Sequence, residues 1–588
     1  LTGTFPSPCG SGFLDHLEIQ GNAFDGAFPD VACLSQLTFL DASGNAFETL
    51  AGDGGWIARN RVVDVSFRSN ALRGSLPSAG ICGPYTRRVD LSGNPGLVGA
   101  IPESVGDCAS LHELRLGETL DVGSSDDVED DAEDASSASG DEGTDGSVSG
   151  VSFSFPSEAT LARLTRLTHL HLRGVGLEGA VPRSLFALPG LVELDLSHNR
   201  LAGELPSALP SELSGGDFRW PANLHRLALS RNNLTGVVPS SLLALRSLRK
   251  LYLARNNFEG MEAFPAETPP AGNDDAAANE TTPATEESEF FENNAFSFAA
   301  RLDVLDLSSN ALRVFPETLE RVGGLTALSL ANNEMRGPVP PWLGERDTLA
   351  HVRLDGNALA GSLESWLGTN RLLDLQSLRV DGNPGITGPL SPNAIRRMTR
   401  LKRLNVSGVG SFGAFPHALG VAGASLDALT HLHARGSGLN GTLPATLFAA
   451  LPNLRTLDLR DNALSGFVPC DTLRTHASLE TLLLANNTFN GPFPRLSDAL
   501  ETRAEAMRDA FGADHARAKV VDLRGAGDEA SGGFECPLPR DAAAYADLEC
   551  TCPAGRAGAD AGRFACVPCA PGAFSANAGA SEGHLCPA

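Results

Sequence analysis

Leucine residues recur along this chain in one fixed pattern, Leu-x-x-Leu-x-Leu-x-x-Asn-x-Leu, of which residues 191–201 carry a clear copy. The central Leu-x-Leu alternates with a period of two, which predicts a short strand whose leucines face inward and whose other residues face outward. A single copy buries too little apolar surface to be stable alone, so the copies must stack on one another. The pattern therefore predicts a repeat solenoid with parallel strands in register and one continuous leucine core.

The asparagine of this pattern has a separate structural role. Alignment of the copies gives 17 repeats, and all but those with Thr119, Val175, Val409 and Ser437 carry Asn at this position. Where the chain turns off a strand, backbone groups of adjacent coils lack partners, and a side-chain amide can both donate to them and accept from them. We predict a ladder of stacked asparagines made of Asn22, Asn45, Asn70, Asn94, Asn199, Asn232, Asn256, Asn310, Asn333, Asn357, Asn383, Asn462 and Asn487.

The second half of the repeat is rich in turn-forming residues. Eleven repeats continue as Leu/Phe/Met-x-Gly-x-x-Pro, as in residues 72–77 and 201–206. Glycine permits a tight turn, and the residue before a proline favours extended over helical backbone. The side of each coil opposite its strand is therefore predicted to hold short extended pieces and single turns, without long helices. A weaker copy at residues 520–524 is expected to close the array.

These repeats resemble the plant-type leucine-rich repeat found in ectodomains of receptor-like kinases and receptor-like proteins and in inhibitors of wall enzymes. The resemblance covers about residues 1–525. It implies an α/β repeat solenoid, a right-handed superhelix with a parallel β-sheet on its concave face and mostly irregular or 3-10 structure on its convex side. It also implies recognition outside the cell, because such ectodomains bind peptides, wall glycans or a co-receptor.

The acidity of the chain is concentrated in two segments. The formal net charge is −26, and residues 121–146 hold 11 acidic residues while residues 259–292 hold 10, with no basic residue in either. Both stretches are poor in apolar residues, which is typical of disordered loops. We therefore predict acidic disordered insertions at 120–157 and 259–297. The remaining charge of about −5 describes a nearly neutral folded body.

Cysteine usage indicates an oxidising compartment. Cys9 and Cys33 are 24 residues apart, and Cys82 and Cys108 are 26 apart, so each pair lies one coil apart on the same flank. Side chains in such positions can come within bonding distance, and we predict a disulfide in each pair.

A cysteine-rich tail follows the repeats, and we predict a small disulfide-rich module at 535–588. Residues 549–555 are similar to the end of an EGF-like module, and residues 566–575 are similar to the cysteine-rich repeats of ephrin-receptor type. So few apolar residues require stapling by disulfides or by a metal, and a zinc site is the alternative to disulfides. The candidate disulfide residues of the tail are Cys536, Cys550, Cys552, Cys566 and Cys569.

The sequence offers little for catalysis. Residues 174–179 and 436–441 match the Gly-x-Gly-x-x-Gly pattern of dinucleotide sites, but Pro182 and Pro444 follow where such a site needs a helix. Both matches also fall in the same register of the leucine repeat. The chain has no metalloprotease His-Glu-x-x-His motif and no Walker loop. We expect no enzymatic activity, no cofactor and no bound metal.

The outward positions beside the strand leucines form the candidate binding surface. Asp41, Asp64 and Asp90 make it acidic in the early repeats, whereas basic residues gather in repeats 8 to 16 and histidines occupy outward strand positions in both halves. Arginine forks bind carboxylates, so an anionic ligand such as an acidic peptide or wall polysaccharide is favoured. The alternative is an ordinary solvated face, or one covered by the chain's own acidic insertions. The candidate ligand-binding residues are Arg226, Lys250, Tyr252, Arg255, Arg353, Arg379, Arg403, His431, His433, Arg435 and Arg460.

We therefore predict the extracellular ligand-recognition region of a cell-surface protein, with a protein, peptide or anionic glycan as ligand and a co-receptor as a further partner. Nucleic acid is disfavoured, because the basic positions lack interleaved aromatic residues and the chain is acidic overall. The chain begins inside a coil and stops inside a cysteine pattern, so we expect an excerpt whose membrane anchor lies outside it. The alternatives are an adhesive or matrix protein with the solenoid as spacer, and a secreted inhibitor of a wall-degrading enzyme.

Overall fold

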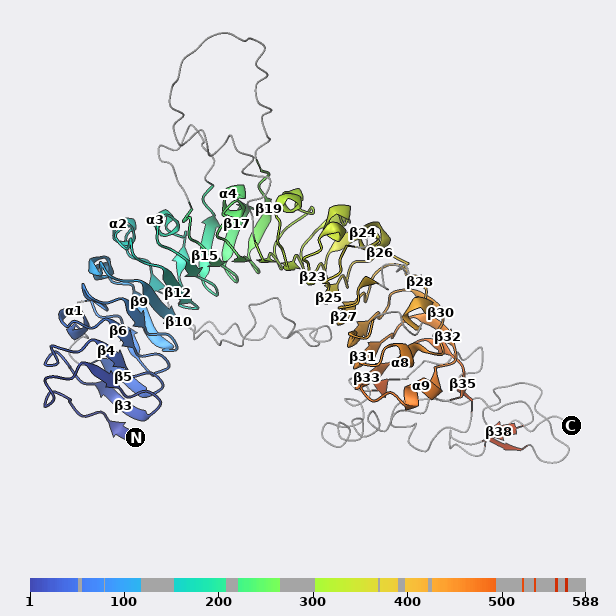
Figure 1. Cartoon of the computed structure of the whole chain (residues 1–588), viewed down its shortest axis with the longest axis horizontal. Coiled ribbons are helices and arrows are strands. Elements are labelled where there is room, and N and C mark those ends of the chain that lie inside the picture. The colour runs from blue at the N-terminus through green and yellow to red at the C-terminus, as the bar shows by residue number, and fades with distance from the viewer. Residues whose placement is uncertain are drawn as a thin grey trace, which may run out of the picture. The chain divides into compact units, whose positions relative to one another are not determined.

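The computed structural model describes residues 1–50, 55–78, 80–117, 153–207, 220–264, 302–368, 371–389, 397–420 and 426–492, with strand segments at 521–522, 534–535, 556–558 and 566–568. The chain divides into two compact units, Leu1–Ala327 and Leu328–Ala588. The division falls within strand β21, Ala327–Ser329, and each unit is a stack of similar coils (Figure 1).

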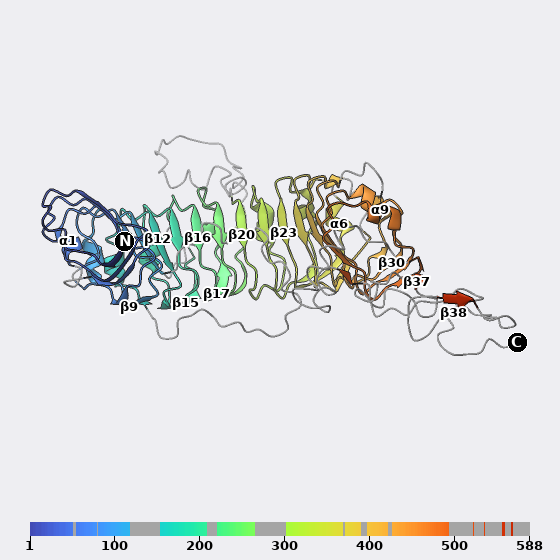
Figure 2. The same ribbon diagram turned by 90° about the horizontal axis from the view of Figure 1, so that it is seen from below.

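In the first unit, every coil contributes one strand to a parallel sheet, called the principal sheet (Figure 2). Neighbouring strands pair in register, so that Glu193, Leu194 and Asp195 lie beside Arg226, Leu227 and Ala228. The strands are β2 (His16–Glu18), β4 (Phe39–Asp41), β6 (Asp64–Ser66), β8 (Arg88–Asp90), β10 (Glu113–Gly117), β12 (His169–Arg173), β14 (Glu193–Asp195), β16 (Arg226–Ala228), β18 (Lys250–Tyr252) and β20 (Val304–Asp306).

The second unit is built in the same way. Its principal strands pair in parallel from β23 to β36, and the pairing of β36 with β33 shows that the weak copy at 520–524 adds a further strand. The strands are β23 (His351–Arg353), β25 (Ser377–Arg379), β27 (Arg403–Asn405), β29 (His431–His433), β31 (Thr456–Asp458), β33 (Thr481–Leu483) and β36 (Val521–Asp522).

The second half of each repeat forms short strands of its own, which pair into small parallel side sheets. The side sheets of the first unit are β1 (Thr2–Thr4), β3 (Ala23–Phe28) and β5 (Ala46–Leu50); β7 (Arg73–Ser75), β9 (Gly96–Ala100) and β11 (Phe153–Ser154); and β13 (Glu178–Gly179), β15 (Arg200–Glu204), β17 (Asn233–Val238) and β19 (Asn257–Met261). Those of the second unit are β22 (Arg336–Pro338), β24 (Ala358–Ser362) and β26 (Gly385–Thr387); β28 (Gly413–Ala414), β30 (Leu439–Thr442), β32 (Ala463–Gly466) and β34 (Thr488–Phe489); and β35 (Gly491–Pro492) and β37 (Phe534–Glu535).

Helices in the described residues are single turns of four or five residues, as the Gly and Pro pattern predicts. Most begin directly after the repeat proline, which lies at the N-cap in an extended conformation, as Pro182 does before α3 and Pro239 before α4. They are α1 (Trp56–Arg59), η2 (Glu103–Asp107), α2 (Glu158–Leu161), α3 (Arg183–Phe186), α4 (Ser240–Leu243), η4 (Glu317–Arg321), η5 (Pro341–Glu345), α6 (Glu364–Leu367), η6 (His417–Gly420), α8 (Leu447–Ala450) and α9 (Cys470–Arg474).

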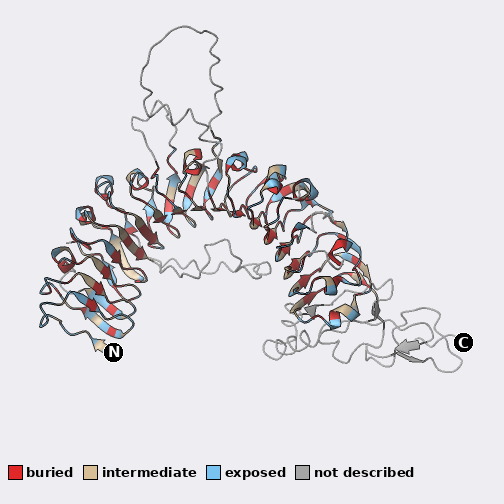
Figure 3. Cartoon of the chain, viewed as in Figure 1, coloured by how far each residue is buried: buried red, intermediate tan, exposed pale blue. Residues whose placement is uncertain are grey.

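The core of each unit lies between the principal strands and the opposite side of the coil (Figure 3). The central leucine of a principal strand is buried while its neighbours are more exposed, as at Val352 between His351 and Arg353. This alternation is the period-two pattern of the sequence, and it leaves one side of the principal sheet to polar side chains.

The register, repeated from coil to coil, brings the predicted asparagines into a hydrogen-bonded ladder. Asn357 is typical, since its Nδ2 donates to the carbonyl oxygens of Leu330 and Leu354 at 3.0 Å each. Its Oδ1 accepts from the backbone N–H of Met335 at 3.1 Å. Where Asn is replaced by Ser437, the hydroxyl still donates to a carbonyl of the preceding coil, that of Val406, at 2.8 Å. The ladder thus satisfies backbone groups that the turn would leave unpaired in the core.

Two disulfides link neighbouring coils of the first unit, Cys9 to Cys33 and Cys82 to Cys108. The cysteine-rich tail is described only as short strands, and β38 (Arg556–Gly558) pairs with β39 (Cys566–Pro568) in antiparallel fashion. The side chains of the five predicted tail cysteines lie outside the described residues, and the prediction for them stays a prediction.

The boundaries predicted for the acidic insertions are wrong at two ends. The predicted segment 120–157 includes β11, where Phe153 is buried and pairs with β9, and Ser157, which caps α2 through a bond from the Thr160 N–H. The segment 259–297 begins within β19, which ends at Met261. Acidic composition extended the prediction into residues that the repeat needs. The remainder, 120–152 and 265–297, lies outside the described residues.

Candidate ligand-binding face

The outward side of the principal sheet carries three columns of side chains in each unit. The first and third residues of each strand point away from the buried central residue, and a further residue follows two positions later, where the strand enters its turn. Parallel, in-register pairing places equivalent residues of successive coils side by side. The face is therefore determined by residues about 25 positions apart in the sequence.

In the second unit, two arginines and two aspartates form a compact cluster on this face. Arg353 approaches Asp355 with its Nε 3.4 Å from Oδ1. Arg379 lies between two carboxylates, with its Nε 3.8 Å from Asp355 Oδ1 and 3.5 Å from Asp381 Oδ1. Burial and the neighbouring Asp355 raise the pKa of Asp381 to about 6, although Arg379 acts in the opposite direction. The predicted arginines are thus paired within the protein, and the cluster is close to neutral.

A second group of ion pairs lies further along the same sheet. Arg460 binds Asp458 through two contacts, Nε to Oδ1 at 2.9 Å and NH2 to Oδ2 at 2.6 Å. Arg435 binds Asp461 with its Nε 2.5 Å from Oδ2, and Asn486 donates to the other oxygen at 2.6 Å. Partial burial acts to raise the pKa of Asp461, but the bonds from Asn486 and Arg435 outweigh it and hold that pKa below its usual value.

Two histidine pairs repeat the same arrangement in the two units. His431 and His433 flank the central leucine of β29 with nearly parallel rings 6.3 Å apart. His169 and His171 occupy the same positions of β12, with ring centres 6.4 Å apart, but their ring planes are tilted by 57°. In each pair a preceding threonine contacts the first ring, as Thr430 Oγ1 does with His431 Nδ1 at 2.8 Å.

The middle of the first unit holds a cluster with an aromatic centre. The guanidinium carbon of Arg226 lies 4.6 Å from the centre of the Tyr252 ring. His171 Nε2 lies 3.4 Å from Glu193 Oε2. A hydrogen bond from His171, together with the charges of His169 and Arg226, holds the pKa of Glu193 below its usual value despite its partial burial.

Several of the predicted ligand-binding residues differ in burial or in strand position from what the alternation predicts. Tyr252 is only 2% exposed, because the longer side chain of Arg226 on the preceding strand covers its ring. Arg255, Arg435 and Arg460 lie beyond the ends of their strands, and Arg255 has a positive φ of 54° in its turn. Strand positions are occupied by Arg226, Lys250, Tyr252, Arg353, Arg379, Arg403, His431 and His433.

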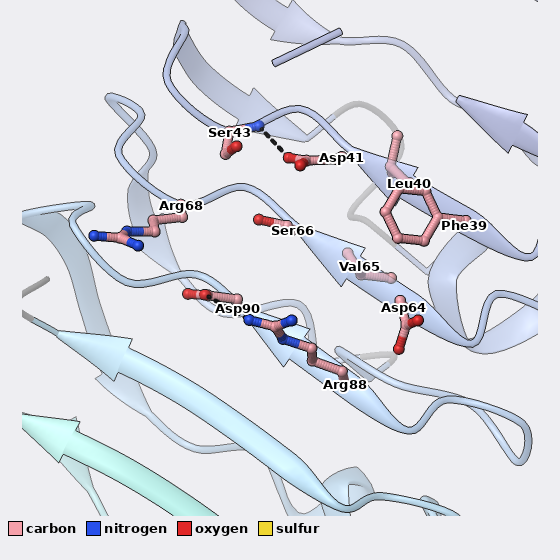
Figure 4. Close-up of a pocket in the computed structure, with 10 residues that line it drawn as sticks. All are labelled: Phe39, Leu40, Asp41, Ser43, Asp64, Val65, Ser66, Arg68, Arg88 and Asp90. Carbon is pink, nitrogen blue, oxygen red and sulfur yellow. Dashed lines mark hydrogen bonds and ion pairs between the residues drawn. The ribbon is translucent and has the colours of Figure 1, made fainter. Parts of the chain in front are cut away.

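A recess in the first unit brings together acidic and basic residues whose proximity the sequence analysis did not predict. It spans β4, β6 and β8 and has a volume of about 200 Å³ (Figure 4). The three predicted aspartates line it, but Arg68 and Arg88 line it too, so the expectation of an acidic early face is wrong at this place. The alternation Asp64-x-Ser66-x-Arg68 was the available signal, because it places both charges on the outward side of one coil.

The described part of the chain offers neither a metal site nor a membrane-spanning helix. It holds no group of three or more His, Cys, Asp or Glu side chains arranged to hold a metal ion. Within the same ranges, no helix is long and apolar enough to cross a membrane.

Comparison with known proteins gives matches over the repeats. Family models described as Leucine rich repeat match residues 206–260 and, in a second model, 190–211 and 453–473. Among solved structures, that of PEPR1-AtPEP1 has a TM-score of 0.56 at 24% identity, covering 81% of this chain and 59% of that one. The structure of a TDR receptor has the same TM-score at 22% identity, covering 84% and 80%. The fold is therefore that of a leucine-rich-repeat solenoid of the kind seen in receptor ectodomains.

The proteins that resemble this chain in sequence form a narrower group than those that share its fold. Receptor-like protein 35 of Arabidopsis thaliana is 31% identical over 208 residues, which is 35% of this chain and 21% of that protein. Receptor-like protein 18 of the same plant is 26% identical over an equally long segment, or 20% of its length. This chain thus resembles plant receptor-like proteins over its repeats, and it spans about a fifth of the length of these relatives.

Proposed function

We propose that this chain is the ligand-recognition region of an extracellular leucine-rich-repeat receptor-like protein. It binds a peptide or protein partner, or a glycan, on the outward side of the principal sheet, and it performs no catalysis. A co-receptor is a further partner, and a membrane anchor outside this chain holds the whole protein at the cell surface.

The observation that carries this proposal is the composition of the outward face. The core uses leucines and asparagines for stability, whereas the strand positions on the outward side vary from coil to coil among charged, histidine and small residues. The repeat scaffold holds these side chains in place, but the stability of the scaffold does not depend on which residues they are. This arrangement suits a recognition surface. The names of the relatives, receptor-like proteins, agree with this use of the fold.

The disulfides support an extracellular location. Cys9–Cys33 and Cys82–Cys108 each close one coil against the next. Such bonds form and persist in oxidising compartments and are rare in the cytosol.

The test is to select peptides that bind the immobilised whole chain and to ask which face they use. One substitution on the outward face of each unit, Lys250→Gln and Arg403→Gln, is compared with Arg371→Gln, which removes the same charge from an exposed residue between α6 and β25. We expect at least one face variant to weaken a selected ligand about tenfold or more, and the control to leave it unchanged. Ligands that are insensitive to both face variants but sensitive to the control would contradict the proposal.

A further inference from the structure

The recess over β4, β6 and β8 is lined by side chains of opposite charge. Below it the strand centres Leu40 and Val65 are adjacent in the register of the principal sheet, with their side chains buried in the core on the other side. The same register aligns Phe39 with Asp64 on one side of them. Figure 4 shows the Asp64 carboxylate and the Phe39 ring at one end of the recess and the Arg68 side chain at the other.

One end of the recess is suited to a cation. The carboxylate of Asp64 makes no hydrogen bond or ion pair with any other described residue, and it is half-buried beside the aromatic ring of Phe39. The far side of that ring is stacked on His16, with centroids 5.7 Å apart and planes at 24°. Asp41 lies on the same strand as Phe39 and supplies a second carboxylate, one oxygen of which accepts from the Ser43 N–H at 2.9 Å. A cation here gains from both the carboxylates and the ring face.

The other end is suited to a carboxylate. The guanidinium of Arg68 is half-buried and has no hydrogen-bond or ion-pair partner among the residues that the structure describes. Arg88 is different, because its NH2 lies 3.8 Å from Asp90 and its Nε 3.4 Å from Glu113. Arg68 is thus the cationic group of the recess that remains available to a ligand, and a planar guanidinium binds a carboxylate through two bonds.

We propose that this recess is a binding site for an extended peptide segment that carries a Lys or Arg side chain and, four residues away on the same face, a carboxylate. The spacing follows from the strand, because Asp64 and Arg68 are four residues apart and an extended chain advances about 3.3 Å per residue, or roughly 13 Å in all. A peptide in the same conformation places two such side chains at the same separation. The site deepens the proposed function, on which it rests, by naming a place and a charge pattern for a peptide ligand.

The experiment measures the binding of fluorescent synthetic peptides to the whole chain by anisotropy. The first probe is Lys-Ser-Gly-Ser-Glu-amide with an uncharged fluorophore on its N-terminal α-amine; a second has norleucine in place of Lys, and a third has Gln in place of Glu. Each is titrated against the unmodified chain, Asp64→Asn and Arg68→Gln. The matched controls are Asp25→Asn on the side sheet and Arg59→Gln on α1, both exposed and both outside the recess. Melting temperatures equal to that of the unmodified chain show that the variants are folded.

We expect the effect of each recess substitution to depend on the oppositely charged side chain of the probe. Asp64→Asn weakens the first probe at least fivefold and leaves the norleucine probe unchanged, while Arg68→Gln weakens the first probe and leaves the Gln probe unchanged. The two controls bind all probes as the unmodified chain does.

Two results would overturn the site. One is that no probe binds at millimolar concentration; the other is that Asp64→Asn weakens the first and the norleucine probes equally, or that Arg68→Gln weakens the first and the Gln probes equally. If peptides selected on the whole chain depend on Lys250 or Arg403 but not on Asp64 or Arg68, the recess proposal fails while the proposed function stands. An acidic oligosaccharide that binds with full dependence on Arg68 and none on Asp64 would also contradict the peptide assignment.

Discussion

The guanidinium of Arg226 covers the ring of Tyr252 at 4.6 Å, although the two residues are 26 positions apart on successive strands. The contact buries an aromatic ring on the polar side of the sheet, leaving Tyr252 2% exposed. Cation–ring contacts contribute about 0.5 to 2 kcal/mol, so most of the stabilisation comes from burial of the ring itself. The outward face of the first unit therefore contains a small packed cluster in addition to its solvated side chains.

Truncation of this ring is expected to destabilise the chain. Replacing a large buried aromatic residue by alanine costs about 3 to 5 kcal/mol, and we expect Tyr252→Ala to lower the free energy of unfolding by an amount in this range. Tyr252→Phe is the matched control, because it keeps the ring under Arg226, and its cost is expected to stay below about 1.5 kcal/mol. Urea unfolding followed by circular dichroism measures both. Equal losses in the two variants would show that the hydroxyl, and not the ring, is what matters at this position.

The asparagine ladder predicts that two Asn→Ala substitutions differ strongly in their effect on the free energy of unfolding. Asn357→Ala leaves the N–H of Met335 and the carbonyls of Leu330 and Leu354 without their partner inside the core. Each buried unsatisfied group costs about 1 to 3 kcal/mol, so a loss of roughly 3 kcal/mol or more is expected. Asn440→Ala removes the same side chain from an exposed position on β30 and is expected to change stability by less than about 0.5 kcal/mol. A loss at Asn357 no greater than that at Asn440 would contradict the ladder's role.

The ladder also shows why so much of this fold can be read from the sequence. The inward leucines, the turn glycines and the asparagines each act within one coil or between adjacent coils, and their spacing repeats with the coil. A local pattern therefore predicts the strands, their parallel pairing and the short helical turns. It fails at the insertion boundaries, because composition alone cannot show that Phe153 is buried against the neighbouring coils.

The outward face was only partly predictable, for a physical reason. The alternation identifies which residues point outward, but their pairing depends on side-chain length and on the coil beside them. Arg379 reaches Asp355 of the preceding coil as well as Asp381 of its own, so a column that reads as basic is neutralised in the structure. The recess was not predicted from the sequence. Asp64 and Arg68 are available to a ligand because their side chains form no ion pair with other described residues, and the pattern of a single repeat does not show this.

The two disulfides are expected to differ in their susceptibility to reduction. Cys9 and Cys33 are exposed, whereas Cys82 and Cys108 are 3% and 1% exposed. Thiol–disulfide exchange requires access of a thiolate to the sulfur, so mild reductant is expected to open Cys9–Cys33 first in the folded chain. Differential alkylation followed by peptide mass spectrometry measures the order. Simultaneous opening of both bonds under native conditions would show that burial does not protect the second one.

Loss of the buried disulfide is expected to lower stability measurably. A closed loop of 26 residues corresponds to about 3.5 kcal/mol in the chain-entropy description. The double variant Cys82→Ser/Cys108→Ser is therefore expected to unfold at lower urea than the unmodified chain. The control is the variant Cys9→Ser/Cys33→Ser in its oxidised and reduced forms, because among the described residues these two forms differ in the Cys82–Cys108 bond and both keep its sulfur atoms. Equal stability of the oxidised and reduced forms would contradict this prediction.

The cluster around Asp381 makes the stability of the second unit depend on pH. Burial and the nearby Asp355 raise the pKa of Asp381 from 3.8 to about 6, so the folded chain holds a proton there that the unfolded chain releases. Stability from this group is present below about pH 4 and is lost as the pH rises through 6. The difference of about 2 pKa units corresponds to roughly 3 kcal/mol. Arg379 and Arg353 remain charged over this range and limit the loss without reversing its sign.

Asp381→Asn isolates this contribution, because it keeps the shape of the side chain and removes its titration. The free energy of unfolding is measured at several pH values from 4 to 7 for both chains. Relative to the variant, the unmodified chain is expected to lose stability between pH 4 and 6 and to change little above pH 7. Carboxyl groups with lowered pKa, such as Asp461, contribute in the opposite direction, but they are present in both chains and cancel in the difference. A difference that is independent of pH, or that grows in favour of the unmodified chain as the pH rises, would show that Asp381 stays ionised in the folded cluster and that Arg379 compensates its burial.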